Sequence, residues 1–284
     1  MRTSISAACA AGAVALGAIA VFAQWPSYPS DGPRTPDGKI DMSAPTPRTP
    51  DGKPDLSGIW NLAPGPGRGR GGKGKDKEAP PPPPPPSDEG PPLATFFNIG
   101  ANLKDGVPLQ PWAAEVLAKR RADNDKDNPD AHCLPMGLMQ FHEHPQPRKI
   151  IQTPKEVLII YEANHGLRQI YLDGRTLPGN DPDPWWFGYS IGHWDGDTLV
   201  VETTGYRDDV WLDVWGTPMT SAGKTIERFR RPNFGSMQID ITIDDPKAYT
   251  KPFTVRVNHR LSPDTEMIEF ICQDRDASHY VGKQ

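Results

Sequence analysis

A histidine in the last third of the sequence stands where a buried imidazole is expected. His259 alternates with Val255 and Val257, so these side chains should share the inward face of one strand. An imidazole on such a face either lines a ligand cavity, where it can exchange protons near neutral pH, or is a core residue with a fixed hydrogen-bond partner. The pattern allows both interpretations.

A predicted hairpin gathers a second set of polar side chains. The Asp-Gly pair at 195–196 suits the centre of a type I′ turn. That register places His193 opposite Thr198, and it places Tyr189 opposite Glu202. If this face of the hairpin is interior, Tyr189, His193 and Glu202 form a cluster suited to hydrogen-bonding a ligand or to acid–base catalysis. If it is exterior, they are ordinary surface residues.

Two further charged residues flank a short loop. Glu162 shares its phase with Leu158 and Ile160, and Arg168 follows the loop at 164–166. Glu162 and Arg168 are therefore a candidate ion pair, which would either face a ligand or bridge two internal segments.

The sequence His142-Glu143-His144 invites comparison with a metal site. An extended segment would place His142 and His144 on one side, as for two zinc ligands. Zinc needs a third ligand, and no recognised spacing supplies one from His132 or His165. Two prolines follow directly, so we expect a loop there, without a metal or another cofactor.

Tryptophan is concentrated after residue 184. Trp185 and Trp186 are adjacent, and neighbouring residues of an extended chain cannot both point inward. One indole should therefore lie at a pocket mouth or in solvent, where its flat face suits an aromatic ligand or a sugar ring. The candidate ligand-binding residues are accordingly Trp185, Trp186, Tyr189, His193, Glu202, Arg168 and His259.

The elements that must position these residues are mainly strands. Residues after 147 follow a period of two, and the short connections favour antiparallel neighbours. A closed barrel leaves no strand edge exposed, so we predict an all-β, antiparallel barrel of about eight to ten strands. One flanking helix is expected from Pro111 to about Asp123. The strand candidates are 56–62, 148–153, 156–163, 167–173, 188–194, 197–204, 224–231, 236–244, 253–261 and 266–273.

Composition divides the chain into regions. Most of the 34 prolines precede residue 112, and the motif Pro-Arg-Thr-Pro-Asp-Gly-Lys occurs twice, at 33–39 and 47–53, each copy with a turn signal. We predict a signal peptide (1–23), a disordered tether (24–54), a first barrel strand (55–63), a Pro/Gly-rich insert and linker (64–110), a helix and connecting loop (111–147), the rest of the barrel (148–275) and a C-terminal tail (276–284).

The first 23 residues predict export to the periplasm or the medium. Arg2 precedes an uncharged, alanine-rich run, and Ala23 suits signal peptidase. Cleavage removes Cys9 and leaves Cys133 and Cys272, which in an oxidising compartment should form one disulfide; two unrelated buried thiols are the alternative. The net charge of −5 and mean hydropathy of −0.60 exclude a polytopic membrane protein and a basic surface for nucleic acid. No stable membrane insertion is expected after cleavage.

Two resemblances refine the fold. The segment Gly58-Ile59-Trp60 is similar to the G-x-W motif that opens lipocalin and other calycin barrels, which implies a barrel that holds small, often apolar ligands. Residues 54–273, apart from the insert, resemble a set of uncharacterised exported bacterial β-rich proteins, a resemblance that implies no activity. It rests on the segments 54–60, 172–175, 194–201, 227–229 and 245–246.

These observations favour an exported barrel that binds a small molecule. The alternative is a periplasmic or secreted hydrolase or lyase that uses His193 or His259 with Glu202 or Glu162 as acid–base residues. A third possibility is an envelope scaffold. Converging polar side chains would favour the enzyme, a deep apolar cavity the binder and a filled core the scaffold. The sequence decides neither the ligand, nor whether catalysis occurs, nor the oligomeric state.

Overall fold

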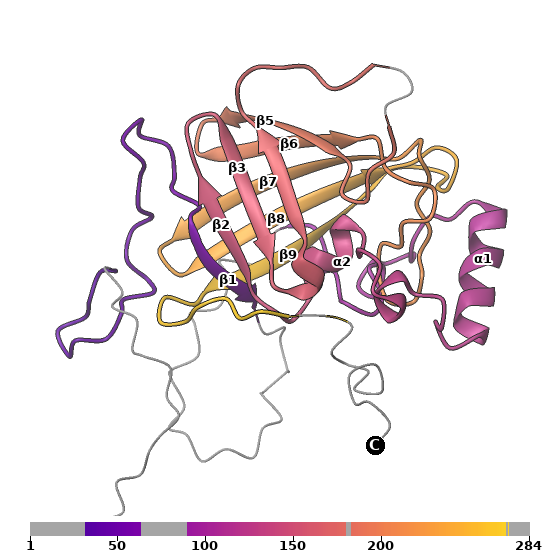
Figure 1. Ribbon diagram of the computed structural model, residues 1–284, viewed down its shortest axis with the longest axis horizontal. Helices are drawn as coiled ribbons and strands as arrows, with labels where there is room; N and C mark the ends of the chain where they lie inside the picture. The colour runs from indigo at the N-terminus through magenta and orange to yellow at the C-terminus, as the bar shows by residue number, and fades with distance from the viewer. Residues whose placement is uncertain (1–31, 64–89, 180–182, 271, 273–284) are drawn as a thin grey trace, which may run out of the picture.

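The computed structural model describes residues 32–63, 90–179, 183–270 and 272. Within these residues the chain is mainly β, and its strands close into one barrel accompanied by two α-helices (Figure 1). No helix in these ranges is long and apolar enough to cross a membrane. The signal peptide predicted over 1–23, the first part of the predicted insert (64–89) and the tail predicted over 276–284 lie outside the described residues.

The nine strands follow one another around the barrel in chain order, and β1 pairs with β9 to close it. Neighbouring strands are antiparallel except β4 and β5, which are parallel. We predicted antiparallel neighbours throughout, and the parallel pair of β4 and β5 contradicts that prediction: parallel neighbours need a longer connection than a hairpin turn, because the chain must return to the starting end of the first strand. The strands are β1 (Gly58–Leu62), β2 (Arg148–Gln152), β3 (Glu156–Tyr161), β4 (Leu167–Tyr171), β5 (Tyr189–Asp195), β6 (Thr198–Thr204), β7 (Lys224–Asn233), β8 (Ser236–Asp244) and β9 (Phe253–Leu261).

The core is formed by the inward-facing residues of the barrel, because alternate side chains of each strand point inward. Strand β9 shows the pattern most regularly: every second residue from Phe253 to Leu261 is buried. Trp60 from β1 is fully buried, and its indole nitrogen donates to the Leu56 carbonyl over 3.0 Å. The prediction of a β-barrel is confirmed, with strand bounds close to those expected.

The predicted tenth strand over 266–273 is absent from its described part, residues 266–270 and 272. The barrel closes between β1 and β9, so no free edge is left for another strand. Residues 262–270 instead pass along the outside, and the amide of Ile268 donates to the Glu162 carboxylate over 3.1 Å. The predicted disulfide between Cys133 and Cys272 is present, with 5.5 Å between the Cα atoms.

Helix α1 (Pro111–Ala122) confirms the predicted helix, but it buries fewer of its apolar side chains than we expected. Only Ala113 is buried, while Trp112 is exposed and donates from its indole to the Lys247 carbonyl over 2.8 Å. The basic end of the helix holds it in place, because Arg120 stacks over Trp211 at 4.3 Å and Arg121 over Trp215 at 4.1 Å. The described residues also form two short 3-10 helices, η1 (Pro129–His132) and η2 (Ala163–His165).

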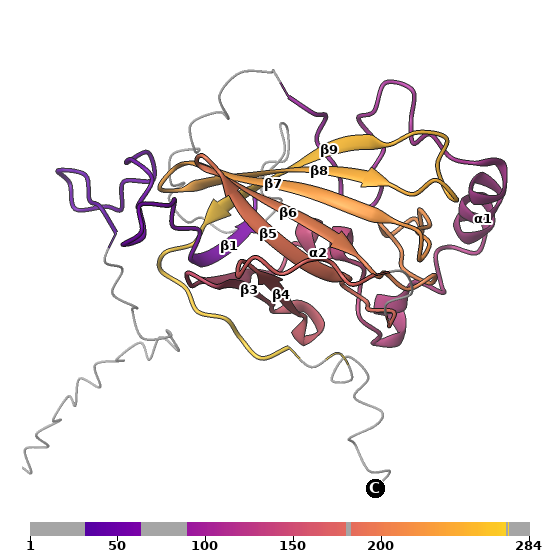
Figure 2. The same cartoon turned by 90° about the horizontal axis from the view of Figure 1, so that it is seen from above.

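Helix α2 (Leu138–Glu143) replaces the loop predicted around the two histidines. All six residues are buried, and Figure 2 shows α2 between the β5–β9 side of the barrel and the β3–β4 side. The chain enters α2 through Gly137, where an added Cβ would lie 2.5 Å from the Trp211 carbonyl oxygen. Tertiary packing therefore decides the conformation here, in a segment too short to form a stable helix alone.

Part of the predicted tether is packed on the barrel. In the described range 32–54, each Pro-Asp-Gly copy forms a turn with its glycine at positive φ. The carbonyls of Met42 and Ala44 accept from the amides of Gly235 and Phe234, over 2.9 and 2.8 Å. Residues 42–54 are therefore anchored, not free, because their backbone caps the β7–β8 turn.

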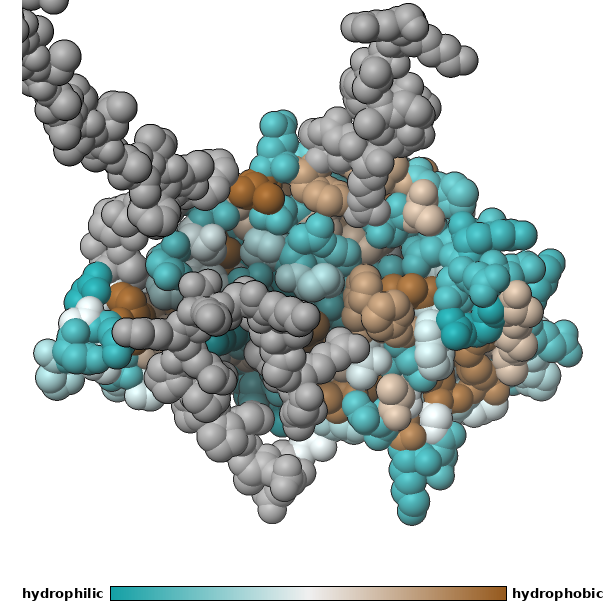
Figure 3. Space-filling view, turned by 90° about the horizontal axis from the view of Figure 1, so that it is seen from below, coloured by the Kyte–Doolittle hydropathy of each residue, from teal (hydrophilic) through white to brown (hydrophobic). Residues whose placement is uncertain are grey.

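Large apolar side chains are also found on the surface. On the face shown in Figure 3 they are interspersed with hydrophilic residues, as is usual for a globular protein. The exposed set comprises Phe97, Trp112, Leu134, Ile151, Leu167, Trp185, Ile226 and Ile268.

Candidate functional site

Six polar and charged side chains from α2 and five strands meet inside the barrel. Inward alternation of the strands positions five of them, and α2 carries the sixth into the barrel end. Each side chain is at most 2% exposed. We call them the interior polar cluster: His142, Arg148, Tyr161, Arg168, Glu227 and His259.

One half of the cluster is an ion pair at Glu227. Both Arg168 guanidinium nitrogens donate to the Glu227 carboxylate, one over 3.0 Å, and His142 Nε2 lies 2.7 Å from Oε1. The hydroxyls of Ser190 and Thr203 accept from Arg168 over 3.0 Å. Burial alone would raise the pKa of Glu227, but Arg168 and His142 outweigh it and lower that pKa to about 2. Glu227 is therefore ionised at neutral pH.

His142 is oriented by that carboxylate. Burial lowers the pKa of His142, and Glu227 opposes this effect only in part, so the imidazole is neutral at neutral pH. A carboxylate only accepts hydrogen bonds, so the imidazole proton lies on Nε2. The other ring nitrogen, Nδ1, then carries a lone pair, and it has no hydrogen-bond partner among the described residues.

The other half of the cluster surrounds Arg148. Its terminal nitrogens donate to the backbone carbonyls of His142, His144 and Gln146 over 2.7, 2.5 and 2.9 Å. His259 Nε2 lies 2.8 Å from the His142 carbonyl and 2.5 Å from Arg148 Nη1. Burial lowers the pKa of Arg148 to about 10, so the group remains a cation at neutral pH.

Four buried polar atoms of the cluster lack a hydrogen-bond partner in the described part of the chain. They lie on rings and side chains close to one another: the His142 ring centroid is 6.1 Å from that of His259 and 6.5 Å from that of Tyr161. Each such atom costs about 1–3 kcal/mol when it is left unsatisfied. The atoms are His142 Nδ1, Arg148 Nε, the Tyr161 hydroxyl oxygen and His259 Nδ1.

The hairpin candidates lie on the outside of the barrel. His193 and Glu202 are exposed and Tyr189 is half-buried, whereas Ser190 and Thr203 from the opposite face are buried. The three polar residues therefore do not form an interior cluster. Tyr189 accepts from Arg175 over 3.1 Å.

The hairpin register also differs from the expected one. The turn centres on Gly196, with φ of +58°, and Asp197, so His193 lies opposite Val200 and not Thr198. Tyr189 lies opposite Thr204 and not Glu202. The pairing moves by two residues, so each side chain keeps its face but changes its neighbour.

Arg168 and Glu162 do not pair with each other. Arg168 is inside the barrel, where Glu227 is its partner, and Glu162 accepts from the backbone of Ile268 instead. In β3 the inward residues are Val157, Ile159 and Tyr161, so Glu162 follows the outward phase.

The two neighbouring tryptophans differ in exposure. Trp185 is 51% exposed, while Trp186 is half-buried beneath Arg207, whose guanidinium lies 4.7 Å from the ring centroid. Trp186 lines a groove of about 410 Å³ beside α1, together with Trp211 and Arg120. Neither tryptophan belongs to the interior polar cluster.

The histidines considered as metal ligands face different surroundings. His142 reaches Glu227, whereas the His144 ring packs edge-on against Phe96 at 5.1 Å. Within the described ranges, no three His, Cys, Asp or Glu side chains come together as a metal site would require.

The cluster therefore includes His142, Arg168 and His259, which the sequence singled out, and three residues that it did not. Glu227 could have been found, because it alternates with Thr225 and Phe229 on the inward face of β7. Arg148 and Tyr161 face each other directly on β2 and β3, each at the end of its strand, where alternation is hardest to assign.

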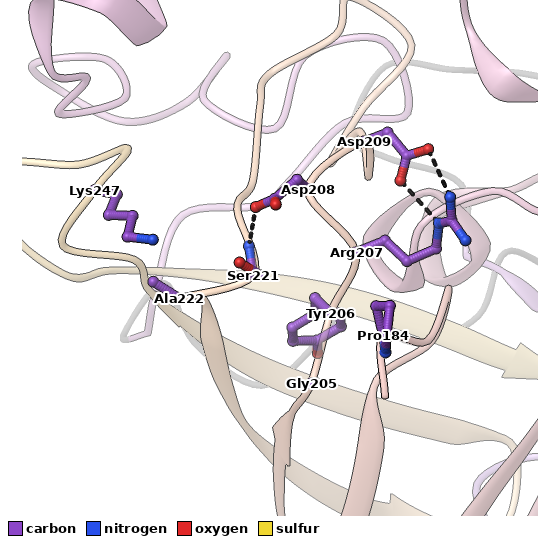
Figure 4. A pocket seen from close by; sticks show the side chains of 9 residues that line it. All are labelled: Pro184, Gly205, Tyr206, Arg207, Asp208, Asp209, Ser221, Ala222 and Lys247. Atoms are coloured by element: carbon purple, nitrogen blue, oxygen red, sulfur yellow. Dashed lines mark hydrogen bonds and ion pairs between the residues drawn. The ribbon is translucent and has the colours of Figure 1, made fainter. Parts of the chain in front are cut away.

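A second concave feature lies beside the ends of β6 and β7. This hollow of about 740 Å³ is lined by residues including Tyr206, Asp208, Ser221 and Lys247 (Figure 4). Asp208 accepts from the Ser221 amide over 2.7 Å. The Tyr206 hydroxyl is 2.7 Å from that of Thr225, an inward residue of β7, so Tyr206 connects the hollow to the polar interior.

The protein is a closed β-barrel of mixed strand directions. Its interior contains a cluster of charged and polar side chains, four of whose atoms have no hydrogen-bond partner among the described residues. Comparison of the chain with known protein families, curated proteins and solved structures finds no significant match. The interpretation of this cluster therefore rests on its own geometry.

Proposed function

We propose that this protein binds a small molecule inside the barrel, at the interior polar cluster. The observation that carries the proposal is the set of four buried polar atoms without partners. Buried polar groups in folded proteins nearly always have a partner, from the protein, an ordered water or a ligand. Six other buried polar atoms outside the cluster also lack a partner among the described residues, so it is the gathering of four in one cluster that supports a binding site.

The contrast between the two halves of the cluster supports the proposal. Around Glu227, both carboxylate oxygens and the Arg168 guanidinium have partners from Ser190, Thr203 and His142. Such a network holds the barrel wall in register and leaves its members fixed. Three of the four unpaired atoms are on Arg148, Tyr161 and His259, so this half is where we place the ligand.

We further propose that the protein acts in the periplasm or the medium. A disulfide persists in an oxidising compartment, and Cys133 and Cys272 form one. The leader predicted over 1–23 points to the same compartment. The resemblance to calycin barrels is in line with a binding role but rests on three residues.

Native mass spectrometry of protein purified from the compartment to which it is exported tests the binding function. We expect a retained small molecule that is lost in His259→Leu, which removes one ring of the site. The matched control is His193→Leu on the outer face, which should keep it. Wild-type protein without any retained mass would contradict the proposal and favour the scaffold.

An acid–base enzyme is the second candidate function, and one contact favours it. Glu227 holds His142 through Nε2 and leaves the Nδ1 lone pair free, the arrangement of an imidazole base oriented by a carboxylate. The His142→Gln variant should then retain an unconverted substrate, and wild-type protein should convert that molecule when it is added. Equal conversion by both proteins would exclude this role.

A further inference from the structure

Two buried arginines in one barrel differ in their charge partners. Arg168 and Arg148 are each 1% exposed. Arg168 forms its ion pair with Glu227, whereas Arg148 has no carboxylate within ion-pair distance in the described part of the chain. Its terminal nitrogens bond only to backbone carbonyls and to His259. The barrel interior thus holds one positive charge without a negative counterpart.

Such a charge is costly to bury. A guanidinium removed from water needs both hydrogen bonds and an opposite charge to recover its hydration energy. Backbone carbonyls supply partial negative charge to the two terminal nitrogens, but the Nε–H group of Arg148 is left without an acceptor. The contrast in pKa follows: burial lowers that of Arg148 to about 10, while for Arg168 the attraction of Glu227 overcomes the same effect of burial and raises it.

A second free donor stands beside that group. Tyr161 is the direct cross-strand neighbour of Arg148, and both side chains are inside the barrel. Side chains at such positions have Cβ atoms about 5 Å apart. The Tyr161 hydroxyl makes no hydrogen bond of normal geometry, although Arg168 is near enough to lower its pKa. Burial outweighs Arg168 and raises that pKa to about 12, so the hydroxyl keeps its proton and can donate it. Two neighbouring donors next to a cation match the two oxygens of a carboxylate.

We infer that the ligand of this barrel is a small organic acid, whose carboxylate pairs with Arg148 and accepts a hydrogen bond from Tyr161. This inference rests on the proposed binding function and adds the chemical class of the ligand. The third free atom refines the class, because His142 Nδ1 carries a lone pair and accepts a hydrogen bond. A hydroxyl near the carboxylate would satisfy it, so hydroxy acids should bind more tightly than plain acids.

The first test compares matched ligands on the unaltered full chain. Isothermal titration at constant ionic strength would use acetate, propionate, lactate and benzoate, and the primary amide of each. An amide keeps the shape of the acid but lacks its charge, so we expect each acid that binds to do so at least tenfold more tightly than its amide. Lactate should bind more tightly than propionate. Sodium sulfate serves as a control for nonspecific anion binding.

The second test changes the protein. Arg148→Met should weaken acid binding at least tenfold, and Arg148→Lys should restore part of it because the charge returns. Arg228→Met is the matched control, since Arg228 pairs with Asp195 on the outer surface. Arg148 also holds three carbonyls next to α2, so its variants can fail to fold. Tyr161→Phe removes one hydroxyl only and should still weaken binding of the acids more than that of the amides.

The outcomes separate this inference from the proposed function. If acids and amides bind equally, or the molecule released from purified protein is neutral, the ligand class is wrong while the binding function stands. If sulfate competes as well as the acids, the site is a general anion site and the inference is overturned. If nothing in the series binds and no molecule is retained, both proposals fail. A released carboxylic acid supports both.

Discussion

Replacing Glu227 by glutamine should destabilise the protein strongly, because it leaves the Arg168 charge buried without a counter-charge. The pKa of Glu227 is about 2 in the folded protein, against an ordinary value of 4.5. This difference corresponds to about 3 kcal/mol of stability from ionised Glu227 at neutral pH. Loss of one partner of a buried ion pair typically costs about 3–5 kcal/mol, in agreement with that figure.

The pH dependence provides a second readout of the same perturbation. Because the folded-state pKa is depressed, the stabilisation by Glu227 is fully present above about pH 4.5 and is lost as the pH falls towards 2. Urea unfolding at pH 7 and between pH 5 and 3 should therefore show a large deficit for Glu227→Gln at pH 7 and a smaller one in acid. Glu202→Gln, on the outer face, should change stability by less than about 0.5 kcal/mol.

A double variant tests whether charge is the cause. Arg168→Met combined with Glu227→Gln removes both ions, and it should recover a large part of the loss because replacing a whole buried pair is often near neutral. A deficit below about 1 kcal/mol in Glu227→Gln, or one that does not shrink in acid, would show that the Arg168 charge does not depend on Glu227. The buried pair would then be unimportant for stability.

Three further perturbations follow from particular contacts. His259→Leu should change the free energy of unfolding by less than about 1 kcal/mol, because the His142 carbonyl that His259 contacts still has Arg148 as a donor. The same variant should lose the retained ligand. A large destabilisation with normal ligand retention would remove His259 from the site. The double variant Cys133→Ser with Cys272→Ser should lower stability by up to about 5 kcal/mol, since the disulfide closes a loop over a separation of 139 residues. A wild-type denaturation midpoint that is the same in reducing and oxidising buffer would contradict this prediction. Gly137→Ala should lower stability by about 1–3 kcal/mol in thermal melts, because its Cβ would meet the Trp211 carbonyl. Gly196→Ala serves for comparison, because that position has a positive φ but open space around its Cβ. Equal losses of stability in the two variants would show that packing at Gly137 is not the cause.

Much of the barrel could be predicted from the sequence, because strand alternation is a local signal. The strands β8 and β9 each read as alternating apolar and polar residues, and His259 was placed on an inward face for this reason. Long-range pairing could not be read in the same way. The parallel contact of β4 with β5 and the packing of residues 42–54 on the β7–β8 turn depend on segments far apart in the chain.

The candidate site was only partly predictable for the same reason. Its central contacts join α2 to β7 and β2 to β9, over separations of 85 and 111 residues. His142 was considered as a metal ligand because an extended chain would align it with His144, but burial of the whole segment favours a helix and turns His142 towards Glu227. The polar hairpin residues were misleading candidates, because both faces of β5 are half apolar and only the closed barrel decides which is inside.

A crystal structure of protein purified from its native compartment, at a resolution that shows ordered water, tests the central claim most directly. We expect continuous density for an organic molecule inside the barrel, in contact with Arg148 Nε and the Tyr161 hydroxyl. Ordered waters alone, pairing all four atoms of the interior polar cluster that lack a protein partner, would show that the barrel interior is hydrated and holds no ligand.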